Sequence, residues 1–294
     1  MAKIIDPSQI AQATRRELAD RVGLLKRPLN LVGFLSTDAA PSQTYANYTR
    51  TACTDVGIGF ELRRVGKLGL EKAIDDANAD PEVHGIIVYY PIFATEHDAY
   101  IKDLVDHRKD IEGLGTHWVR KLYHNQRYVD SERKKKAILP CTPLAVVKLL
   151  DAAGAMNRQA ADPLAGKTVT IFNRSEVVGR PLASMLANDG ADVFSFDLDG
   201  PLHFKKEHVV ETAVTRAEAL AGSDIVITGV PSRAFPLVKA SEIRAGIYCV
   251  NFSTMKNFDD DVLEKAAVWV PRVGPMTVTM AMRNTLRLYD NYHS

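Results

Sequence analysis

The fold of this chain is decided by the stretch Gly166-Lys-Thr-Val-Thr-Ile-Phe-Asn-Arg-Ser-Glu-Val-Val-Gly-Arg-Pro181 and the residues that continue it. Thr168–Phe172 is apolar and rich in β-branched side chains, which predicts a strand. Pro181 is typical of a helix start, because its missing N–H costs nothing in the first turn. Gly190 is typical of a helix end, and Val193–Phe196 predicts the next strand. This order indicates a mononucleotide-binding βαβ unit.

An acid, Asp197, ends the second strand of this unit. A carboxylate about 20 residues beyond the loop can accept hydrogen bonds from ribose hydroxyls. The helix N-terminus can offer N–H groups to a pyrophosphate. Only Gly179 remains of a G-x-G-x-x-G pattern, so an ordinary βαβ unit in which Asp197 caps a turn stays an alternative. We favour the interpretation as a cofactor site.

Length and composition narrow the class of protein. A chain of 294 residues suggests two domains. A net charge of +1 gives no general attraction to nucleic acid or membrane surfaces, and no apolar run approaches the ~20 residues of a membrane span. Residues 1–22 lack the apolar segment of a signal peptide. The three cysteines are far apart and the eight histidines show no metal-ligand spacing. We therefore expect a cytoplasmic protein without a metal.

Strands and helices alternate through the chain, which predicts an α/β fold with a parallel sheet in each half. The remaining predicted strands are Leu29–Leu35, Gly59–Val65, Gly85–Tyr90, Asp224–Thr228, Ile247–Phe252 and Ala267–Val270. The remaining predicted helices are Gln9–Val22, 41–55, Leu68–Ala79, Asp98–Val105, Thr116–Leu122, Leu144–Ala153 and Val278–Tyr289. Ser42 is a plausible N-cap, and Gly57 a helix end. The stretch Leu198–Val214 is longer than a normal crossover loop, which indicates an excursion.

One predicted helix carries three polar-tipped side chains on one face, Ser42, Tyr45 and Thr49. They could line a site, or Tyr45 could simply reach water from a half-buried helix. Tyr89 and Tyr90 end an apolar strand, where open α/β sheets bind ligands, and core packing is the alternative explanation.

Two charged segments offer weaker signals. Asp110 and Glu112 flank an isoleucine and could hold a donor edge of a ligand, although acids before a glycine are more often a turn. The basic run Arg133–Lys136 could attract an anionic tail, although a solvated charge run is commoner.

Six motifs follow one another in a recognisable order. They are Ser42–Tyr45 (S-x-x-Y), Gly85–Phe93 (G-I-x-V-Q-L-P-L-P), Lys109–Gly113 (K-D-V-D-G), Pro140–Pro143 (P-C-T-P), Asn173–Pro181 (G-R-S-x-x-V-G-x-P) and Val273–Thr277 (V-G-P-M-T). Together they resemble the methylenetetrahydrofolate dehydrogenase/cyclohydrolase family over nearly the whole chain. The resemblance implies two α/β domains around a cleft, the second with a Rossmann-type parallel sheet.

The chain departs from the family pattern at functional positions. Thr49 stands where the family has its catalytic lysine, and Tyr89 stands in place of the glutamine that orients this lysine. Glu112 replaces an aspartate and Asn173 the first glycine of G-R-S. Leu198 aligns near a serine that helps NADP-dependent members to hold the 2′-phosphate. These departures resemble the fungal, NAD-dependent, monofunctional branch of the family.

The resemblance implies a reaction of one-carbon metabolism: hydride transfer from 5,10-methylenetetrahydrofolate to NAD, giving methenyltetrahydrofolate without its hydrolysis. It places the catalytic positions at Tyr45, Thr49 and Glu112. The implied substrate-binding residues are Ser42, Tyr45, Tyr89, Glu112 and Pro275. The implied cofactor-binding residues are Asn173, Arg174, Ser175, Val178, Gly179, Asp197, Thr228, Gly229 and Val230.

The folate domain would be residues 1–150 plus the terminal helix 273–294, and the NAD domain 151–272. Relatives are homodimers, so a homodimer is expected. Two alternatives stay open: a bifunctional, NADP-dependent dehydrogenase/cyclohydrolase, and a catalytically silent NAD-binding sensor or scaffold. Lys102 and His97 could replace the missing base, but they belong to another predicted element with no reason to face Tyr45.

Overall fold

The computed structural model describes residues 2–294, and its chain divides into two compact units. The eight-stranded unit comprises residues 2–10, 122–125 and 142–276, and the three-stranded unit comprises residues 11–121, 126–141 and 277–294. Helices α1 (Pro7–Val22), α6 (Cys141–Ala152) and α9 (Gly274–Tyr292) each have residues in both units. No helix among the described residues is long and apolar enough to cross a membrane.

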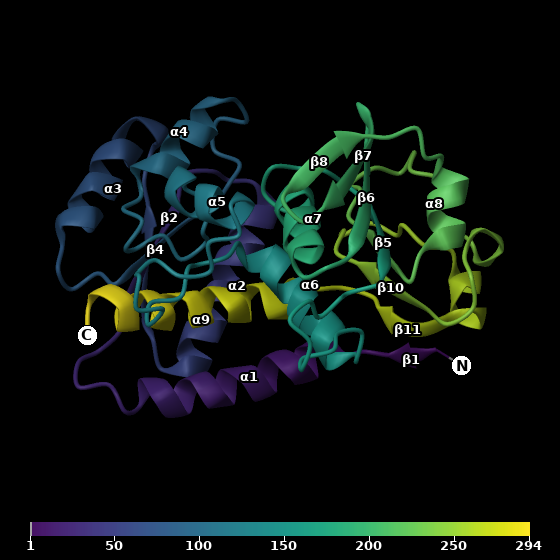
Figure 1. Ribbon diagram of the computed structural model, residues 1–294. Coiled ribbons are helices and arrows are strands. Elements are labelled where there is room, and N and C mark those ends of the chain that lie inside the picture. Colours follow the sequence, from purple (N-terminus) through teal and green to yellow (C-terminus); the bar gives the residue numbers. More distant parts are fainter. Residues whose placement is uncertain (1) are drawn as a thin grey trace. The chain divides into compact units, whose positions relative to one another are not determined.

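The larger sheet has the strand order β1-β11-β10-β9-β5-β6-β7-β8. Its strands, in chain order, are β1 (Lys3–Ile4), β5 (Thr168–Phe172), β6 (Asp192–Asp197), β7 (Gly200–Lys205), β8 (His208–Glu211), β9 (Ile225–Thr228), β10 (Ile247–Asn251) and β11 (Ala266–Val270). The strands from β1 to β6 in this order run parallel to one another. Strand β7 pairs antiparallel with β6, and β8 pairs antiparallel with β7. Figure 1 shows the N-terminal β1 beside β11, far from it in sequence.

The predicted βαβ unit is confirmed as β5, α7 (Gly179–Asn188) and β6. Gly190 adopts a φ of +98° just after α7, so the glycine ends this helix as expected. The chain then leaves β6 for β7 and β8, passes through α8 (Arg216–Gly222), and returns on the other side of β5 as β9. The loops after β5 and β9 therefore diverge at a topological switch point, where such sheets bind ligands.

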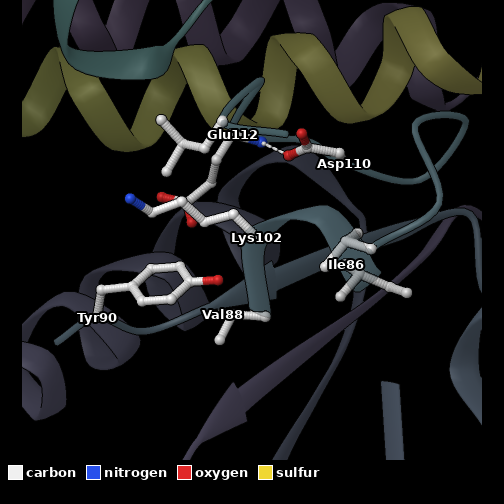
Figure 2. Close-up of a pocket in the computed structure, with 8 residues that line it drawn as sticks. Ile86, Val88, Tyr90, Lys102, Asp110 and Glu112 are labelled. Carbon is white, nitrogen blue, oxygen red and sulfur yellow. Dashed lines mark hydrogen bonds between the residues drawn. The ribbon is translucent and has the colours of Figure 1, made fainter. Parts of the chain in front are cut away.

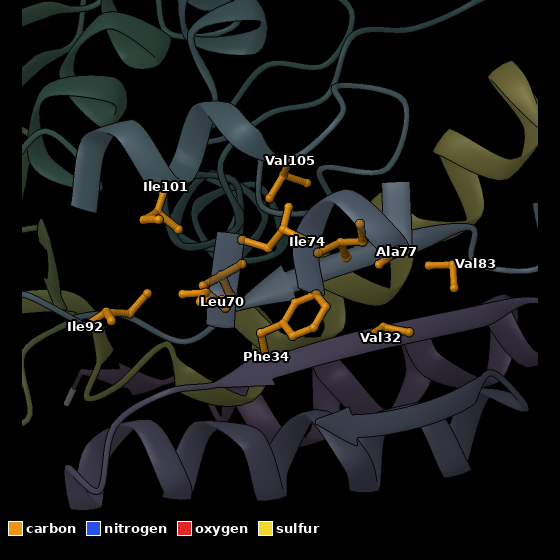
Figure 3. Packing of buried hydrophobic residues seen from close by; sticks show 11 residues of the cluster. Val32, Phe34, Leu70, Ile74, Ala77, Val83, Ile92, Ile101 and Val105 are labelled. Atoms are coloured by element: carbon orange, nitrogen blue, oxygen red, sulfur yellow. The ribbon is translucent and has the colours of Figure 1, made fainter. Parts of the chain in front are cut away.

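The smaller sheet is parallel and has the order β3 (Gly59–Arg64), β2 (Asn30–Leu35), β4 (Gly85–Val88). The helices associated with it include α2 (Ala40–Val56), α3 (Leu70–Ala79), α4 (His97–Leu104) and α5 (Thr116–Tyr123). Short 3₁₀ turns occur at Lys67–Gly69, Ala240–Glu242 and Asp260–Glu264. Figure 3 shows how the core forms: Phe34 of β2 lies near Leu70 and Ile74 of α3, and all three are fully buried. Each such side chain stabilises the fold by about 1.5–3 kcal/mol.

The prediction of Ser42 as an N-cap is wrong. Helix α2 begins at Ala40, so Ser42 lies inside its first turn and its hydroxyl donates to the Tyr90 carbonyl at 3.1 Å. Pro41 explains the shift, because proline is well tolerated at the first helical positions. Gly57 ends the helix with a φ of +81°, as predicted.

Candidate active site

Three of the predicted substrate residues lie together in the three-stranded unit. Tyr45 projects from α2, Tyr89 follows β4, and Glu112 lies in the turn 109–113. The rings of Tyr45 and Tyr89 meet edge to face, with centroids 5.6 Å apart. The side chains of Tyr45 and Glu112 are joined by a hydrogen bond. Residues from three separate segments thus form one cluster, which the sequence could only suggest.

The turn that carries Glu112 is held rigidly from both sides. The Asp110 carboxylate accepts the backbone N–H groups of Glu112 (3.1 Å), Gly113 (2.9 Å) and Gly115 (2.9 Å). The buried Lys109 ammonium donates to the carbonyls of Ala77, Asn78 and Asp80, at the end of α3. Asp110 and Lys109 therefore shape the turn, and Glu112 is the acid of the predicted pair that remains available to a ligand.

The electrostatics of the cluster disfavour charge on Glu112. Burial, followed by the neighbouring Asp110 charge, raises the pKa of Glu112 to about 8, while Lys102 and the Tyr45 hydrogen bond oppose the rise. Burial also raises the pKa of Asp110 to about 6, despite the backbone N–H groups that favour its anion. Burial raises the pKa of Tyr45 well above its usual value. Perturbed groups gathered in this way are typical of functional sites.

Sequence reasoning set Lys102 aside, but the structure places it beside Glu112. A cavity of about 10 Å³, room for about one water molecule, is lined by Ile86, Val88, Tyr90, Lys102, Val105, Asp110, Glu112 and Leu114. In Figure 2 the side chains of Lys102 and Glu112 lie next to each other, with Tyr90 below them. Helical spacing alone could not show which face of α4 meets this cavity. His97 instead contacts Phe93 and Glu71.

Thr49 occupies the position that would hold the family lysine. It is fully buried on α2, and its hydroxyl donates to the Tyr45 carbonyl at 2.9 Å. Tyr89 lies next to it and is 1% exposed. A hydroxyl committed to the helix backbone beside a buried phenol provides no base for proton transfer near neutral pH.

The predicted cofactor loop lies at the switch point of the eight-stranded unit. Asn173 follows β5 with a φ of +138°, in a region that favours glycine. Its side chain accepts from the Ser175 N–H (2.9 Å) and hydroxyl (2.7 Å), and donates to the Gly229 carbonyl (2.9 Å) after β9. The asparagine thus connects the two loops that diverge at the switch point. A Cβ on Gly179 would lie 1.9 Å from the Asn173 carbonyl oxygen, so this approach requires glycine.

The N–H groups that begin α7 are less free than the sequence suggested. The Arg180 N–H donates to the Ser175 carbonyl at 3.0 Å, and the Gly179 N–H to the Ser175 hydroxyl at 3.4 Å. Val178 precedes the helix as its N-cap. A ligand at this end of α7 would therefore compete with Ser175 for these donors.

Asp197 ends β6, as predicted, and its carboxylate accepts the N–H groups of Arg174 (3.1 Å) and Leu198 (2.9 Å). The Arg174 guanidinium donates to the carbonyls of Ser195 (3.1 Å) and Gly200 (2.8 Å). The Arg174 side chain is therefore bound to β6 and to the first residue of β7, while the Leu198 side chain is fully exposed.

The remaining predicted residues lie at the ends of other elements. Thr228 is buried at the end of β9 and contacts Asn251, and the Val230 N–H donates to Asn257 at 2.9 Å. Pro275 lies in the first turn of α9 and belongs to the eight-stranded unit, unlike the other predicted substrate residues. Its role in substrate binding stays a prediction.

Several known proteins are similar to this chain over its full length. It is 42% identical to methylenetetrahydrofolate dehydrogenase [NAD(+)] of Schizosaccharomyces pombe, over 97% of this chain and 92% of the relative. It is 44% identical to the protein of that name from Dictyostelium discoideum, over 98% and 94%. The solved structure of the NAD-dependent 5,10-methylenetetrahydrofolate dehydrogenase from Saccharomyces cerevisiae matches with a TM-score of 0.91 at 39% identity, over 99% and 98% of the two chains.

Two family models account for most of the sequence. The model of the tetrahydrofolate dehydrogenase/cyclohydrolase catalytic domain matches residues 5–112. The model of the NAD(P)-binding domain of the same family matches residues 140–293. The shared architecture and both matches lead to one conclusion: the chain belongs to the tetrahydrofolate dehydrogenase/cyclohydrolase family.

Proposed function

We propose that this protein oxidises 5,10-methylenetetrahydrofolate to 5,10-methenyltetrahydrofolate, transfers the hydride to NAD, and does not hydrolyse the product. The observation that carries the absence of hydrolysis is the pair of residues beside Tyr45, because Thr49 and Tyr89 are buried and supply no base. Full-length similarity to proteins named as NAD-dependent dehydrogenases supports it.

The proposed folate site uses the cluster around Tyr45. The substrate ring would stack on Tyr45, and the donor edge of the pterin would meet Glu112, whose hydrogen bond to Tyr45 fixes its direction. Ser42 and Tyr89 would complete the walls. The bridging carbon of the folate lies between two nitrogens, N5 and N10, whose lone pairs assist the departure of its hydride and stabilise the resulting methenyl cation, so this step needs no protein base. The protein then mainly aligns two rings, and alignment alone can supply about 7–11 kcal/mol.

NAD is proposed to bind the loops after β5, β6 and β9. Asp197 would accept the hydroxyls of the adenosine ribose, while Asn173, Ser175, Val178 and Gly179 would lie along the pyrophosphate. Thr228, Gly229 and Val230 would border the nicotinamide end. NAD supplies the hydride acceptor when bound.

Preference for NAD over NADP follows from charge. A 2′-phosphate about 4 Å from the Asp197 carboxylate would be repelled by roughly 4 kcal/mol at an effective dielectric of about 20. One nitrogen of the Arg174 guanidinium donates to two backbone carbonyls, which directs this side chain at β6 and β7, and Leu198 offers no hydroxyl to a 2′-phosphate. We expect Asp197→Ser to raise the use of NADP at least tenfold relative to NAD. A wild-type enzyme that already prefers NADP would contradict the role of Asp197.

The decisive experiment follows the absorbance of purified protein with methylenetetrahydrofolate plus NAD, and then plus NADP. We expect reduced nicotinamide and methenyl product to appear together with NAD. Decay of added methenyltetrahydrofolate in proportion to enzyme would instead indicate the bifunctional alternative. Absence of turnover with both cofactors, together with measurable NAD binding, would favour the silent sensor or scaffold.

We also propose a cytoplasmic homodimer, with residues 1–150 and 273–294 as the folate domain and 151–272 as the NAD domain. All three cysteines are free and buried, which fits a reducing compartment. Strand β8 ends the larger sheet, and all four of its residues are exposed, including Val209 and Val210. An exposed edge strand with two neighbouring valines is suited to pair with a second copy.

A further inference from the structure

The cavity below Glu112 contains a cation that the proposed chemistry does not use. Its wall carries two acids, Asp110 and Glu112, and one ammonium, that of Lys102. Asp110 already accepts three backbone N–H groups, so its charge is compensated by the turn itself. Among the described residues no backbone N–H compensates Glu112 in this way, and its side chain lies next to that of Lys102 in the wall of the cavity (Figure 2). The structure therefore places one cation at the same cavity as the acid that no backbone N–H compensates.

The position of Lys102 is built into the fold. The Asp98 carboxylate of α4 accepts the N–H groups of Ile92 (3.2 Å), Phe93 (2.9 Å) and Ala94 (3.2 Å), which ties the helix to the segment after β4. The Lys102 ammonium then lies 5.4 Å from the ring centroid of Tyr90. A cation over an aromatic face is attracted by the ring, which favours this rotamer over one that points into water.

We propose that Lys102 is a positioning residue that increases the ionised fraction of Glu112, so that both carboxylate oxygens can accept hydrogen bonds from the substrate. This proposal rests on the proposed role of Glu112 as the acceptor for the pterin edge. Lys102 acts through Glu112, and no step of the hydride transfer passes through it. An ionised Glu112 carboxylate only accepts hydrogen bonds. The site therefore selects a neutral ligand edge with two N–H donors.

The other ionisable groups around Glu112 cannot take over this task. Tyr45 from α2, Tyr89 and Tyr90 after β4, and Cys141 at the start of α6 are neutral at physiological pH, and burial raises the pKa of each. Asp110 on the same turn repels a charge on Glu112. Lys102 from α4 is the one cation among the groups that act on Glu112 in the described chain. Without it, Glu112 would keep its proton to higher pH and could offer a hydroxyl donor where an acceptor is needed.

The first test measures the titration of Glu112 directly and needs no substrate. Protein labelled with ¹³C at glutamate carboxyls is titrated by NMR, and the Glu112 signal is assigned by its loss in Glu112→Gln. We expect a midpoint near pH 8 in the wild type. In Lys102→Met we expect a midpoint at least about one pH unit higher, since a nearby opposite charge lowers the pKa of a carboxyl by about 1–3. Lys102→Arg, which keeps the charge, should stay close to the wild type.

Lys67→Met is the matched control. Lys67 also lies over an aromatic ring, that of Phe93 at 5.2 Å, but it does not line the cavity. Its replacement should leave the Glu112 midpoint unchanged. If Lys102→Met unfolds, Lys102→Gln is measured instead, because it removes the charge and keeps a polar head. An unchanged midpoint in a folded, charge-free variant would overturn the proposal.

The second test measures the consequence for the substrate. If the Glu112 midpoint lies about one pH unit higher in Lys102→Met, the ionised fraction at pH 7 falls about tenfold, and the KM for methylenetetrahydrofolate should rise about tenfold. The kcat and the KM for NAD should stay unchanged. The difference should shrink above about pH 9, where Glu112 becomes ionised in both proteins.

The pH dependence separates this role from a merely structural one. A pH-independent loss in Lys102→Met would contradict a role through Glu112. Failure of the proposed function is recognised separately, because the wild type would then show no turnover while the NMR titration still decides the role of Lys102.

Discussion

At the scale of single residues, Glu112 is proposed to bind the substrate, but its burial lowers the folding stability of the protein. The acid lies beside the cavity, near a second carboxyl, and its pKa is about 8. An unfolded glutamate ionises near pH 4.5, so between these values the unfolded state releases a proton that the folded state keeps. Folding stability therefore falls as the pH rises from about 4.5 to 8, and the loss is complete above 8.

Glu112→Gln should separate the two effects. At pH 7 the variant should be more stable than the wild type by about 3 kcal/mol, and equally stable near pH 4. The KM for the folate should rise about 10- to 100-fold, because a hydrogen bond to a charged group is lost, while the KM for NAD should not change. Denaturant unfolding at several pH values and steady-state kinetics measure this, with the surface variant Glu207→Gln as control. A variant that saturates normally with substrate would remove Glu112 from the site.

Thr49 and Tyr89 allow a second prediction at this scale. Thr49→Lys alone should not create cyclohydrolase activity, because the Tyr89 ring still fills the neighbouring space and a buried ammonium lacks an orienting partner. The double variant Thr49→Lys/Tyr89→Gln supplies both groups and should show enzyme-dependent decay of methenyltetrahydrofolate. The rate of decay against buffer, with heated protein as control, is the measurement. Activity in the single variant would show that Tyr89 is no obstacle.

At the scale of elements, the loop between β5 and α7 depends on the absence of one side chain. A Cβ at Gly179 would overlap the Asn173 carbonyl, which is backbone and cannot rotate away. Gly179→Ala should therefore destabilise the protein by about 1–3 kcal/mol and raise the KM for NAD more than that for the folate. Gly222→Ala is the control, because a Cβ there meets nothing within 4 Å in α8. Thermal melts and kinetics compare the two, and similar behaviour would refute the steric argument.

The elements also show where sequence reasoning succeeds. The order of most strands and helices was predictable, because glycines such as Gly57 and Gly190 mark helix ends by conformations that other residues avoid. Strand β1 and helix α8 were not predicted. The hairpin of β7 and β8 was seen only as an excursion from 198 to 214. Its strands contain Pro201 and two charged residues, Lys205 and Glu211, and its pairing with β6 depends on tertiary contacts. The cluster of Tyr45 and Glu112 came from the family resemblance, whereas Lys102 needed the helix orientation that only the structure gives.

At the scale of the whole molecule, the open edge at β8 determines the prediction for assembly. Val210 is 56% exposed on this strand. If two copies pair along β8, Val210→Lys should shift the protein toward monomers, because an edge lysine opposes strand pairing. Sedimentation velocity measures the change, with Leu68→Lys, at a fully exposed position in the other unit, as control. A monomeric wild type, or a dimer that survives in Val210→Lys, would contradict pairing through β8.

The reactivity of the three buried thiols should report local unfolding of the protein, because each thiol becomes accessible only when the structure around it opens. Burial raises the pKa of Cys53 and Cys249 to about 12 and that of Cys141 well above its usual value, so none reacts as a thiolate while the fold is closed. Cys53 and Cys141 belong to the three-stranded unit, and Cys249 belongs to the eight-stranded unit. A thiol reagent added under native conditions therefore labels whichever unit opens first. Mass spectrometry of the labelled peptides would rank the local stabilities of the two units without a single substitution.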